Sequence, residues 1–198
     1  MKPGYVHRFS KTERTIHWVN ALGFFFLLAT GLILYLPRLS AEVGRRQFIQ
    51  WIHFWGGCAW VAALIVIAVL GDRRGVLRTA REMDVFERED VNWLKRRGPR
   101  EQARFNAGQK INAALNAAFL VLFLVSGLLL WFGEQDTRFQ FASTVLLHDG
   151  LLYVSLVLLL GHLYLALIHP TTRHALRGMV LGDVREDWAR RHHARWDP

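Results

Sequence analysis

The sequence predicts an all-α protein, an integral membrane four-helix bundle with both termini in the cytoplasm. Three observations lead to this fold class: the apolar residues form four blocks, each block holds about 20 residues or more, and only short or charged segments connect them. An apolar helix of ~20 residues is long enough to cross the hydrocarbon core of a bilayer. A chain with 52% hydrophobic residues clustered in this way belongs to the membrane class. We therefore expect a single transmembrane domain over residues 1–198, with spans at about 17–36, 48–70, 111–132 and 145–168.

The basic residues predict the orientation of these spans. Four Lys and Arg residues precede the first span, eleven lie in the segment 71–110 and six lie in the tail 170–198, which makes 21 of the 25 in the chain. The two other connections have only Arg38, Arg45, Arg46 and Arg138. Because cytoplasmic segments of membrane proteins are enriched in Lys and Arg, both termini and the segment 71–110 are expected in the cytoplasm. The net charge of +9 then reflects topology and contact with anionic membrane lipids rather than binding of nucleic acid.

The first two spans are an outward and an inward helix joined by a short outer connection. A polar arm precedes the first span, which opens with His17 and ends before Pro37. The second span has His53 close to its start, followed by Gly56 and Gly57, where a flat ring could approach the backbone. In the predicted orientation, His17 lies on the cytoplasmic side and His53 on the outer side of the membrane.

The second half of the chain repeats this plan after the charged segment. Residues 74–83 are expected to form a short surface helix, and residues 90–94 an amphipathic turn at the interface. The ends of the first and third spans share a pattern of small residues followed by leucine, and the openings of the second and fourth spans also match. This repeat suggests two related hairpins. The tail is too charged to span the membrane, and we expect it to form an amphipathic helix on the inner surface.

The fourth span has two histidines on one face. His148 and His162 are fourteen residues apart, and fourteen steps of ~100° fall only about 40° short of four full turns. At a rise of ~1.5 Å per residue they are ~21 Å apart along the helix axis, so one lies toward each membrane surface. Ionisable side chains within a span are costly in contact with lipid, so both imidazoles are expected to face the protein interior.

Depth pairs these histidines with the two on the first hairpin. His17 and His162 are expected on the cytoplasmic side, and His53 and His148 on the outer side. Two pairs of imidazoles at two depths are typical of bis-histidine ligation of two haems, so we predict two haems, one held by each pair. Small residues near the pairs would give a porphyrin room: Gly31, Gly57, Ser126, Gly127 and Gly150.

Other roles for these histidines stay open. A single histidine within a membrane is often a hydrogen-bond partner between helices. Zinc sites also use histidine, but they gather their ligands at one depth, with cysteine or carboxylate nearby. His169 follows His162 by seven residues on the same face and could replace it as a ligand, although His162 lies deeper. The remaining histidines lie in polar segments and are expected to be solvated: His7, His174, His192 and His193.

A polar cluster precedes the third span at the depth of the inner pair. Asn106 and Gln109 have the spacing of a capping box, which by itself would account for both residues. Together with Gly108 and Lys110, they also offer amide donors, an exposed backbone and an ammonium group to a quinone carbonyl and its protons. The residues alone leave a helix cap and a quinone site open as alternatives.

Several motifs along nearly the whole chain match the pattern of one known family. They are R-F-S and I-H-W-V-N-A within 8–21, I-H-F-W-G-G at 52–57, D-V-N-W-L at 90–94, F-N-A-G-Q-K at 105–110, S-G-L-L-L-W at 126–131, L-L-H at 146–148, G-H-L-Y-L-A at 161–166 and W-A-x-x-H-H-x-x-W at 188–196. On these motifs the chain resembles the gamma subunit, the dihaem cytochrome b, of membrane-bound formate dehydrogenases. F-N-A-G-Q-K together with the tail motif is specific, whereas four spans with histidines alone would not separate this family from hydrogenase cytochromes b.

The resemblance implies a function for the whole chain. It implies an outer haem at His53 and His148, an inner haem at His17 and His162, and a quinone site beside Asn106, Gly108, Gln109 and His162. It further implies a subunit of the bacterial inner membrane that passes electrons from a periplasmic iron–sulfur subunit to menaquinone or ubiquinone, while a molybdenum or tungsten subunit oxidises formate. The alternatives are the cytochrome b subunit of a hydrogenase or another dehydrogenase and, in a different class, a haem-free membrane anchor or transporter.

Overall fold

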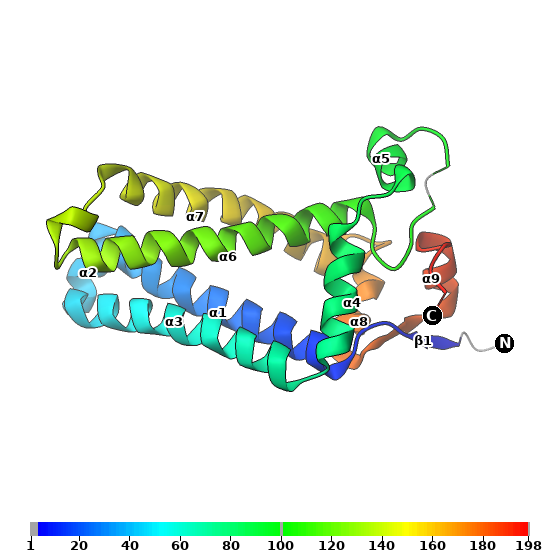
Figure 1. The fold of residues 1–198 in the computed structure, drawn as a ribbon, viewed down its shortest axis with the longest axis horizontal. Helices are drawn as coiled ribbons and strands as arrows, with labels where there is room; N and C mark the ends of the chain where they lie inside the picture. Colours follow the sequence, from blue (N-terminus) through cyan, green and yellow to red (C-terminus); the bar gives the residue numbers. More distant parts are fainter. Residues whose placement is uncertain (1–3, 100, 198) are drawn as a thin grey trace. The chain divides into compact units, whose positions relative to one another are not determined.

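The computed structural model describes residues 4–99 and 101–197. Within these residues, four helices are long and apolar enough to cross a membrane: α1 (Lys11–Tyr35), α3 (Arg46–Leu70), α6 (Ala107–Gly133) and α7 (Ala142–Leu163), which a π-helical turn η2 (Tyr164–Ile168) extends (Figure 1). They confirm the predicted fold class of an all-α membrane protein. Lys2 and Arg100, which contribute to the orientation argument, lie outside the described residues, as does Pro198 at the end of the tail.

Each of these helices begins before its apolar block because a polar first turn precedes the hydrophobic residues. α1 starts with a capping box: the Ser10 hydroxyl accepts from the Glu13 amide at 3.2 Å, and the Glu13 carboxylate accepts from the Ser10 amide at 2.6 Å. α1 ends before Pro37, which is the first residue of a short helix, α2 (Pro37–Val43). Gly44 then ends α2 in the left-handed conformation, with φ of 63°. The connection between α1 and α3 therefore contains a helix of its own.

The chain packs as two compact units. Unit 2 comprises residues 15–71 and 121–150, and it holds α2, α3, most of α1, the end of α6, a 3-10 turn η1 (Thr137–Phe139) and the start of α7. Aromatic rings join its helices: the Phe54 ring stacks on Trp131 with 4.2 Å between centroids, and the Trp60 indole lies against the backbone of Gly23. A side chain at Gly23 would collide with this indole, so glycine permits the close approach of α1 and α3.

Unit 1 comprises the described parts of residues 1–14, 72–120 and 151–198. Besides the start of α6 and the end of α7, it holds these short elements: β1 (Tyr5–His7), α4 (Arg73–Asp84), α5 (Arg88–Lys95), η3 (Arg173–Ala175), α8 (Leu176–Leu181), β2 (Asp183–Arg185) and α9 (Glu186–His192). α4 and α5 match the two short elements that the charged segment predicts. α5 ends where Arg96 adopts the left-handed conformation, with φ of 54°.

A two-stranded sheet joins the first and last elements of unit 1. β1 pairs antiparallel with β2, with Val6 opposite Val184 (Figure 1). Val184 is fully buried and packs with Trp188 and Ala189 of α9. The sequence predicts one amphipathic helix for this tail, and the structure differs: Gly182, with φ of 94°, ends α8, and the chain continues as a strand before α9 begins.

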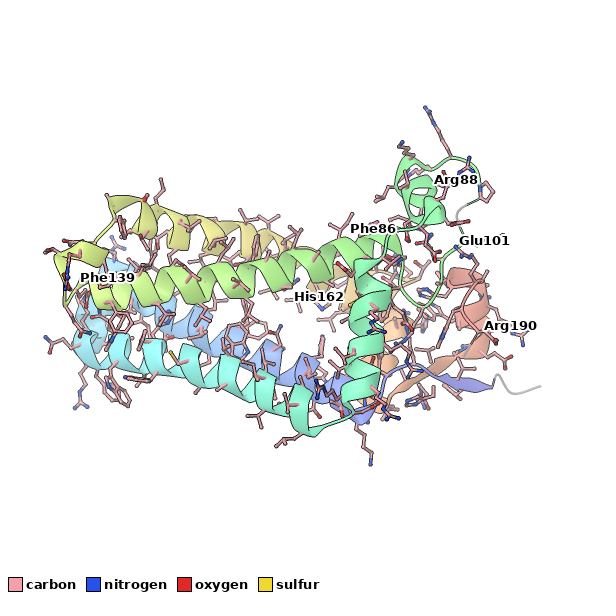
Figure 2. The ribbon with its side chains drawn as sticks, in the orientation of Figure 1. Phe86, Arg88, Glu101, Phe139, His162 and Arg190 are labelled. Atoms are coloured by element: carbon pink, nitrogen blue, oxygen red, sulfur yellow. The ribbon has the colours of Figure 1, made fainter. Side chains whose placement is uncertain are left out.

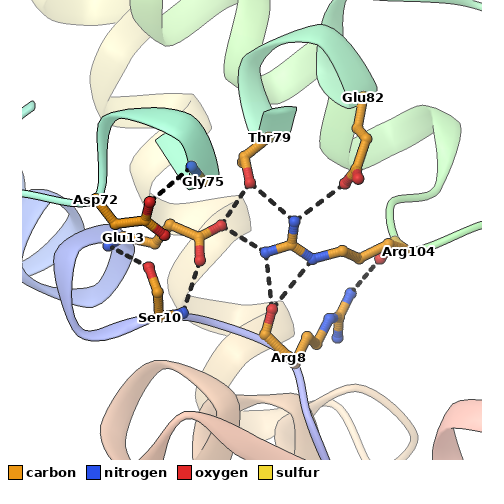
Figure 3. A network of polar contacts seen from close by, with 8 residues as sticks. All are labelled: Arg8, Ser10, Glu13, Asp72, Gly75, Thr79, Glu82 and Arg104. Atoms are coloured by element: carbon orange, nitrogen blue, oxygen red, sulfur yellow. Dashed lines mark hydrogen bonds and ion pairs between the residues drawn. The ribbon is translucent and has the colours of Figure 1, made fainter. Parts of the chain in front are cut away.

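Arg104, which precedes α6, connects three segments of unit 1 (Figure 3). Its guanidinium binds the Glu13 carboxylate at 2.5 Å, the Thr79 hydroxyl at 2.8 Å and the Glu82 carboxylate at 3.0 Å. It also donates to the carbonyl of Arg8 at 2.7 Å, and the Arg8 guanidinium donates in return to the carbonyl of Arg104 at 2.7 Å. The Arg104 and Glu13 side chains are only 12% and 10% exposed, so this network fixes the N-terminal arm and α4 to the segment before α6.

His193 is buried, whereas its polar segment predicts a solvated side chain. It is 2% exposed, and its ring lies against Trp188 and Trp196. Its Nδ1 lies 2.6 Å from the carbonyl oxygen of Ala103 and must donate to it, which leaves Nε2 to accept from Arg8 at 3.2 Å. Burial, and then the positive charge of Arg8, lower the pKa of His193 to about 3, so the imidazole is neutral. The prediction of solvation is wrong because the two tryptophans of this polar segment cover the ring.

We expect His193→Gln to reduce the loss of stability in acid. An unfolded chain with an ordinary imidazole pKa of ~6.5 takes up a proton as the pH falls, whereas buried His193 stays neutral down to about pH 3. Between pH ~6.5 and about pH 3, the free energy of unfolding therefore falls by up to ~1.4 kcal/mol for each unit by which the pH is lowered. Glutamine keeps a donor and an acceptor but does not titrate. Unfolding midpoints measured between about pH 7 and pH 4 check this, with His192→Gln as the control for losing an imidazole from this tail. If the unfolding midpoint of His193→Gln fell with pH as steeply as that of the wild type, the assignment of His193 as a buried, neutral imidazole would be wrong.

Candidate functional site

Two histidines that the sequence predicts as a ligand pair lie next to each other in unit 2. His53 comes from the first half of α3 and His148 from the start of α7. Their ring centroids are 6.4 Å apart, and the two ring planes make an angle of 68°. Both side chains are half-buried. The structure thus brings together two imidazoles from different membrane helices, as their predicted depth requires.

A hydroxyl from the other helix of its hairpin holds each imidazole. Nδ1 of His53 lies 2.8 Å from Oγ1 of Thr30 in α1, and Nδ1 of His148 lies 2.8 Å from Oγ of Ser126 in α6. Each hydroxyl also lies within hydrogen-bond distance of a carbonyl one turn earlier in its own helix, at 3.0 Å for Thr30 and 2.7 Å for Ser126. These contacts fix how each ring is turned and leave its Nε2 as the nitrogen available to a ligand.

A glycine follows each hydroxyl residue and leaves space beside the ring. A Cβ at Gly31 would lie 3.3 Å from Cε1 of His53, and a Cβ at Gly127 would lie 3.8 Å from Cε1 of His148. Each hairpin therefore presents a hydroxyl residue followed by a glycine to a histidine on its second helix. This arrangement confirms, at the site, the internal repeat that the sequence suggests.

The two rings fit a flat group that takes one imidazole on each of its faces. A metal–nitrogen bond of ~2 Å on each side, with the nitrogen ~1 Å from the centre of its own ring, places the two centroids ~6 Å apart. The observed separation is 6.4 Å. A neutral imidazole with its proton on Nδ1, facing the hydroxyl, has its lone pair on Nε2, which is the form that binds a metal. The residues present therefore fit bis-histidine ligation of a haem iron.

The second predicted pair is divided between the two units. His17 lies in the first half of α1, in unit 2, with its ring edge-on to Trp18 at 5.1 Å between centroids. His162 lies one residue before the end of α7, in unit 1 (Figure 2). Because the two histidines belong to different units, their pairing stays a prediction.

His169 does not continue the helix face of His162. The α-helix changes into the π-helical turn η2, and His169 ends that turn with an extended backbone, at φ of −62° and ψ of 125°. A π-helical turn alters the direction in which the following residues face. Nδ1 of His169 lies 3.1 Å from the Thr171 hydroxyl and 3.3 Å from the Thr172 hydroxyl. The assumption that His169 shares the face of His162 therefore does not hold.

The polar cluster before α6 forms the helix cap that its spacing predicts. Oδ1 of Asn106 accepts from the backbone amide of Gln109 at 2.9 Å, and Oε1 of Gln109 accepts from the backbone amide of Asn106 at 3.0 Å. Gly108 lies beside Trp93, whose Cη2 would be 3.5 Å from a Cβ at that position. The cap is confirmed, and it uses only the oxygen atoms of the two carboxamides.

Lys110 is buried and paired. Its ammonium binds the Asp90 carboxylate at 2.6 Å and the Val85 carbonyl at 2.8 Å, and it lies 5.7 Å from the centre of the Phe86 ring. The Lys110 and Asp90 side chains are 6% and 4% exposed. The charge of Lys110, which the sequence offers as part of a possible quinone site, is therefore neutralised by Asp90 of α5.

Two hydroxyls and one carboxylate have roles that were not predicted. Thr30 and Ser126 are small residues in apolar spans, and each precedes a glycine. The recurrence of this hydroxyl–glycine pair in both hairpins is the signal that could have identified them. Asp90 has no comparable signal, because its partner Lys110 is 20 residues away.

Comparison with known proteins finds relatives along almost the whole chain. The chain is 27% identical to the formate dehydrogenase cytochrome b556 subunit of Haemophilus influenzae, over 92% of this chain and 78% of the relative. It is also 27% identical to the formate dehydrogenase cytochrome b556(fdo) subunit of Escherichia coli, over 96% of this chain and 90% of the relative. The nitrate-inducible cytochrome b556(Fdn) subunit of Escherichia coli is 24% identical, over 93% and 86% respectively.

A family profile also covers most of the chain. The profile described as prokaryotic cytochrome b561 matches residues 8–182, a range that includes the four long helices and the four predicted ligands. Membership implies that the protein binds haem b, in agreement with the geometry of His53 and His148. The chain belongs to the prokaryotic cytochrome b561 family.

Proposed function

We propose that this chain is the dihaem cytochrome b subunit of a respiratory formate dehydrogenase and passes electrons from a periplasmic iron–sulfur subunit across the membrane to a quinone. The observation that carries the proposal is the pair His53 and His148, whose rings lie 6.4 Å apart between membrane helices and are each oriented by a hydroxyl. The relatives named as formate dehydrogenase cytochrome b556 subunits support the enzyme class.

In this proposal His53 and His148 hold the outer haem, and His17 and His162 hold the inner haem. The iron supplies reversible one-electron chemistry when the haem is bound. The imidazoles bind as neutral ligands, so they do not bury an unpaired charged side chain in the membrane. The hydroxyls orient the outer ligands, and the apolar helices around them limit the access of water.

The distribution of basic residues supports the orientation. The segments that hold α4, α5, α8 and α9 are rich in Lys and Arg, so they are proposed to lie in the cytoplasm with both termini. His53 and His148 then lie toward the periplasm of a bacterial inner membrane. An iron–sulfur subunit would donate electrons on that side, where the short connections 36–45 and 134–141 join the helices.

The quinone site is proposed beside the cap of α6, at the cytoplasmic side. The cap occupies the carboxamide oxygens of Asn106 and Gln109, and the NH2 group of each remains as a donor for a quinone carbonyl. A cap and a quinone contact are therefore compatible, with Gly108 between the two side chains. Lys110 would reach a quinone only by giving up its ion pair with Asp90, so we assign it the role of holding this segment in place.

Formate oxidation is assigned to another chain. A catalytic subunit with molybdenum or tungsten would oxidise formate, and the iron–sulfur subunit would bring the electrons to the outer haem. By reducing menaquinone or ubiquinone, the present chain would complete a formate:quinone oxidoreductase. The word subunit in the names of the relatives supports such a complex.

Replacement of Asn106 tests the exit of electrons to quinone. Serine and aspartate both keep an oxygen that caps α6, but neither has the NH2 group proposed to bind a quinone carbonyl. We expect both variants to bind two haems and to be reduced by the donor, but to reoxidise with quinone roughly five- to thirty-fold more slowly, as the loss of a hydrogen bond of ~1–2 kcal/mol implies. Stopped-flow absorbance of the b-type bands in the purified complex measures both steps.

Asn116→Ser is the matched control for this experiment. Asn116 lies on the same helix, and its amide donates to the carbonyl of Asn112 at 2.7 Å. This variant should reoxidise at the wild-type rate. Wild-type reoxidation in both Asn106 variants would contradict the quinone site, and a purified wild-type complex without low-spin b-type bands would contradict the proposed function as a whole.

A further inference from the structure

The rings of His53 and His148 are turned strongly out of parallel. Their planes make an angle of 68°, and each ring has its Nδ1 fixed by a hydroxyl at 2.8 Å. Thr30 and Ser126 are only 6% and 0% exposed, so neither hydroxyl can exchange its partner for water from outside. The two hydroxyl contacts, which come from the packing of the helices in each hairpin, therefore determine the angle between the ring planes.

If each imidazole binds iron, that bond determines which atom donates in the hydrogen bond between the imidazole and the hydroxyl. A neutral imidazole that binds iron through Nε2 carries its proton on Nδ1, so Nδ1 must donate and the hydroxyl must accept. A hydroxyl has only one hydrogen, which is then free to go to the helix carbonyl, Phe26 for Thr30 and Leu122 for Ser126. Each contact becomes a chain from imidazole N–H to hydroxyl to backbone carbonyl, in which every donor has one acceptor. A rotated ring would leave a buried N–H without a partner.

We propose that Thr30 and Ser126 are positioning residues that hold the two imidazole planes of the outer haem close to perpendicular and thereby set the electronic state and the reduction potential of its iron. The inference rests on the proposed function, since it concerns the haem held by His53 and His148. It assigns to this haem a property that the ligands alone do not determine.

Two physical effects follow from the positioning. Nearly perpendicular imidazole planes interact with different iron d orbitals and leave them close in energy, whereas parallel planes separate them. The ferric haem then gives a highly anisotropic low-spin EPR signal at low field in place of a rhombic signal. An N–H that donates to a hydroxyl also makes the imidazole a more basic ligand, which stabilises ferric iron and lowers the reduction potential.

The test uses the purified, haem-loaded complex and compares four variants. Thr30→Val and Ser126→Ala each remove one hydroxyl with little change in volume. Thr30→Ser keeps the hydroxyl and should rescue the effect. Ser155→Ala is the matched control, because the Ser155 hydroxyl is bound to the Leu152 carbonyl of its own helix at 2.8 Å. The readouts are low-temperature EPR of the ferric state, a redox titration that resolves both haems, and the rate at which each haem is lost to a haem-binding competitor.

The wild-type complex should show the highly anisotropic signal for the outer haem. In Thr30→Val and Ser126→Ala this signal should move toward a rhombic form, the potential of the same haem should rise, and its affinity should fall about ten-fold or more. The haem at His17 is an internal reference, because His17 and Thr30 are ~20 Å apart along α1. Thr30→Ser and Ser155→Ala should behave like wild type.

The outcomes separate this inference from the proposed function. Loss of the outer haem alone in Thr30→Val, with its retention in Thr30→Ser, supports the inference because only the hydroxyl is restored. An outer haem with a rhombic signal in wild type, or a signal and potential unchanged in both hydroxyl-deletion variants, overturns it while leaving two ligated haems. If Thr30→Val and Thr30→Ser both lost the two haems to the same extent, the inference would also be overturned, because restoring the hydroxyl would then have no effect. A wild-type complex without any low-spin haem overturns the proposed function itself.

Discussion

Replacing His53 or His148 with alanine is expected to remove one haem and leave the other, and both variants are expected to lose the same haem. The two rings lie 6.4 Å apart, and we propose that both bind the same iron, so neither could be replaced by the neighbouring apolar residues. Electron transfer from the donor to quinone should fall by more than the ~10–100-fold typical of losing a group that only orients a ligand.

The haem content of the purified complex measures this result directly. A pyridine haemochrome assay should give half the wild-type ratio of haem to protein in each variant, and the redox titration should lack the same component in both. His169→Ala is the control, since the π-helical turn η2 separates His169 from the face of His162. Retention of two haems in His53→Ala, or loss of different haems in the two variants, would overturn the pairing.

Arg104→Met is expected to destabilise unit 1 strongly. The variant removes the partner of Glu13, whose side chain is 10% exposed, together with the contacts to Glu82 and to the carbonyl of Arg8. Breaking a buried ion pair by removing one partner costs ~3–5 kcal/mol, because the remaining charge stays buried without compensation. We therefore expect a lower midpoint of thermal unfolding and slower quinone reduction, since Arg104 holds the segment that leads to Asn106.

A double variant tests whether the unpaired charge causes the loss. Arg104→Met with Glu13→Gln should recover part of the stability, because glutamine leaves no buried charge behind. Arg190→Met is the control: Arg190 pairs with Glu186 on the exposed side of α9, with 79% of its side chain accessible (Figure 2). Exposed ion pairs of this kind contribute little to the free energy of unfolding, so this variant should have an unfolding midpoint close to that of the wild type. Equal effects of Arg104→Met and Arg190→Met would contradict the network.

The membrane helices and the proximity of His53 to His148 could be predicted because they depend on local properties of the chain. An apolar block of sufficient length forms a helix in lipid whatever the rest of the chain does, since its backbone groups must bond to one another. The rise of a helix then converts position in the sequence into depth, and depth was enough to bring His53 to His148. The cap at Asn106 and Gln109 is similarly local, because both partners lie in one turn.

The long-range contacts of unit 1 could not be predicted because their partners are far apart in the sequence. His193 bonds to Ala103 and Arg8, which precede it by 90 and 185 residues, and the strands β1 and β2 come from opposite ends of the chain. Each strand has only three residues, and the pattern of the tail predicts a helix there, so no local pattern shows which residues these segments bury. The π-helical turn after His162 is also a product of packing, since Tyr164–Ile168 reads as a continuation of the apolar span.

The pairing of β1 with β2 has a consequence for how the protein is made. A ribosome releases the N-terminal arm first, so Val6 must wait for Val184 while all four membrane helices are delivered to the bilayer. Until residues 183–185 emerge, Val6 has no partner strand, and His193, which follows them, cannot contact Arg8. Pairing of these two strands is therefore a late step of folding. A nascent chain that stops before residue 183 would have the four long apolar helices, yet β1 would lack its partner strand, and proteases and chaperones can recognise such an incompletely folded chain.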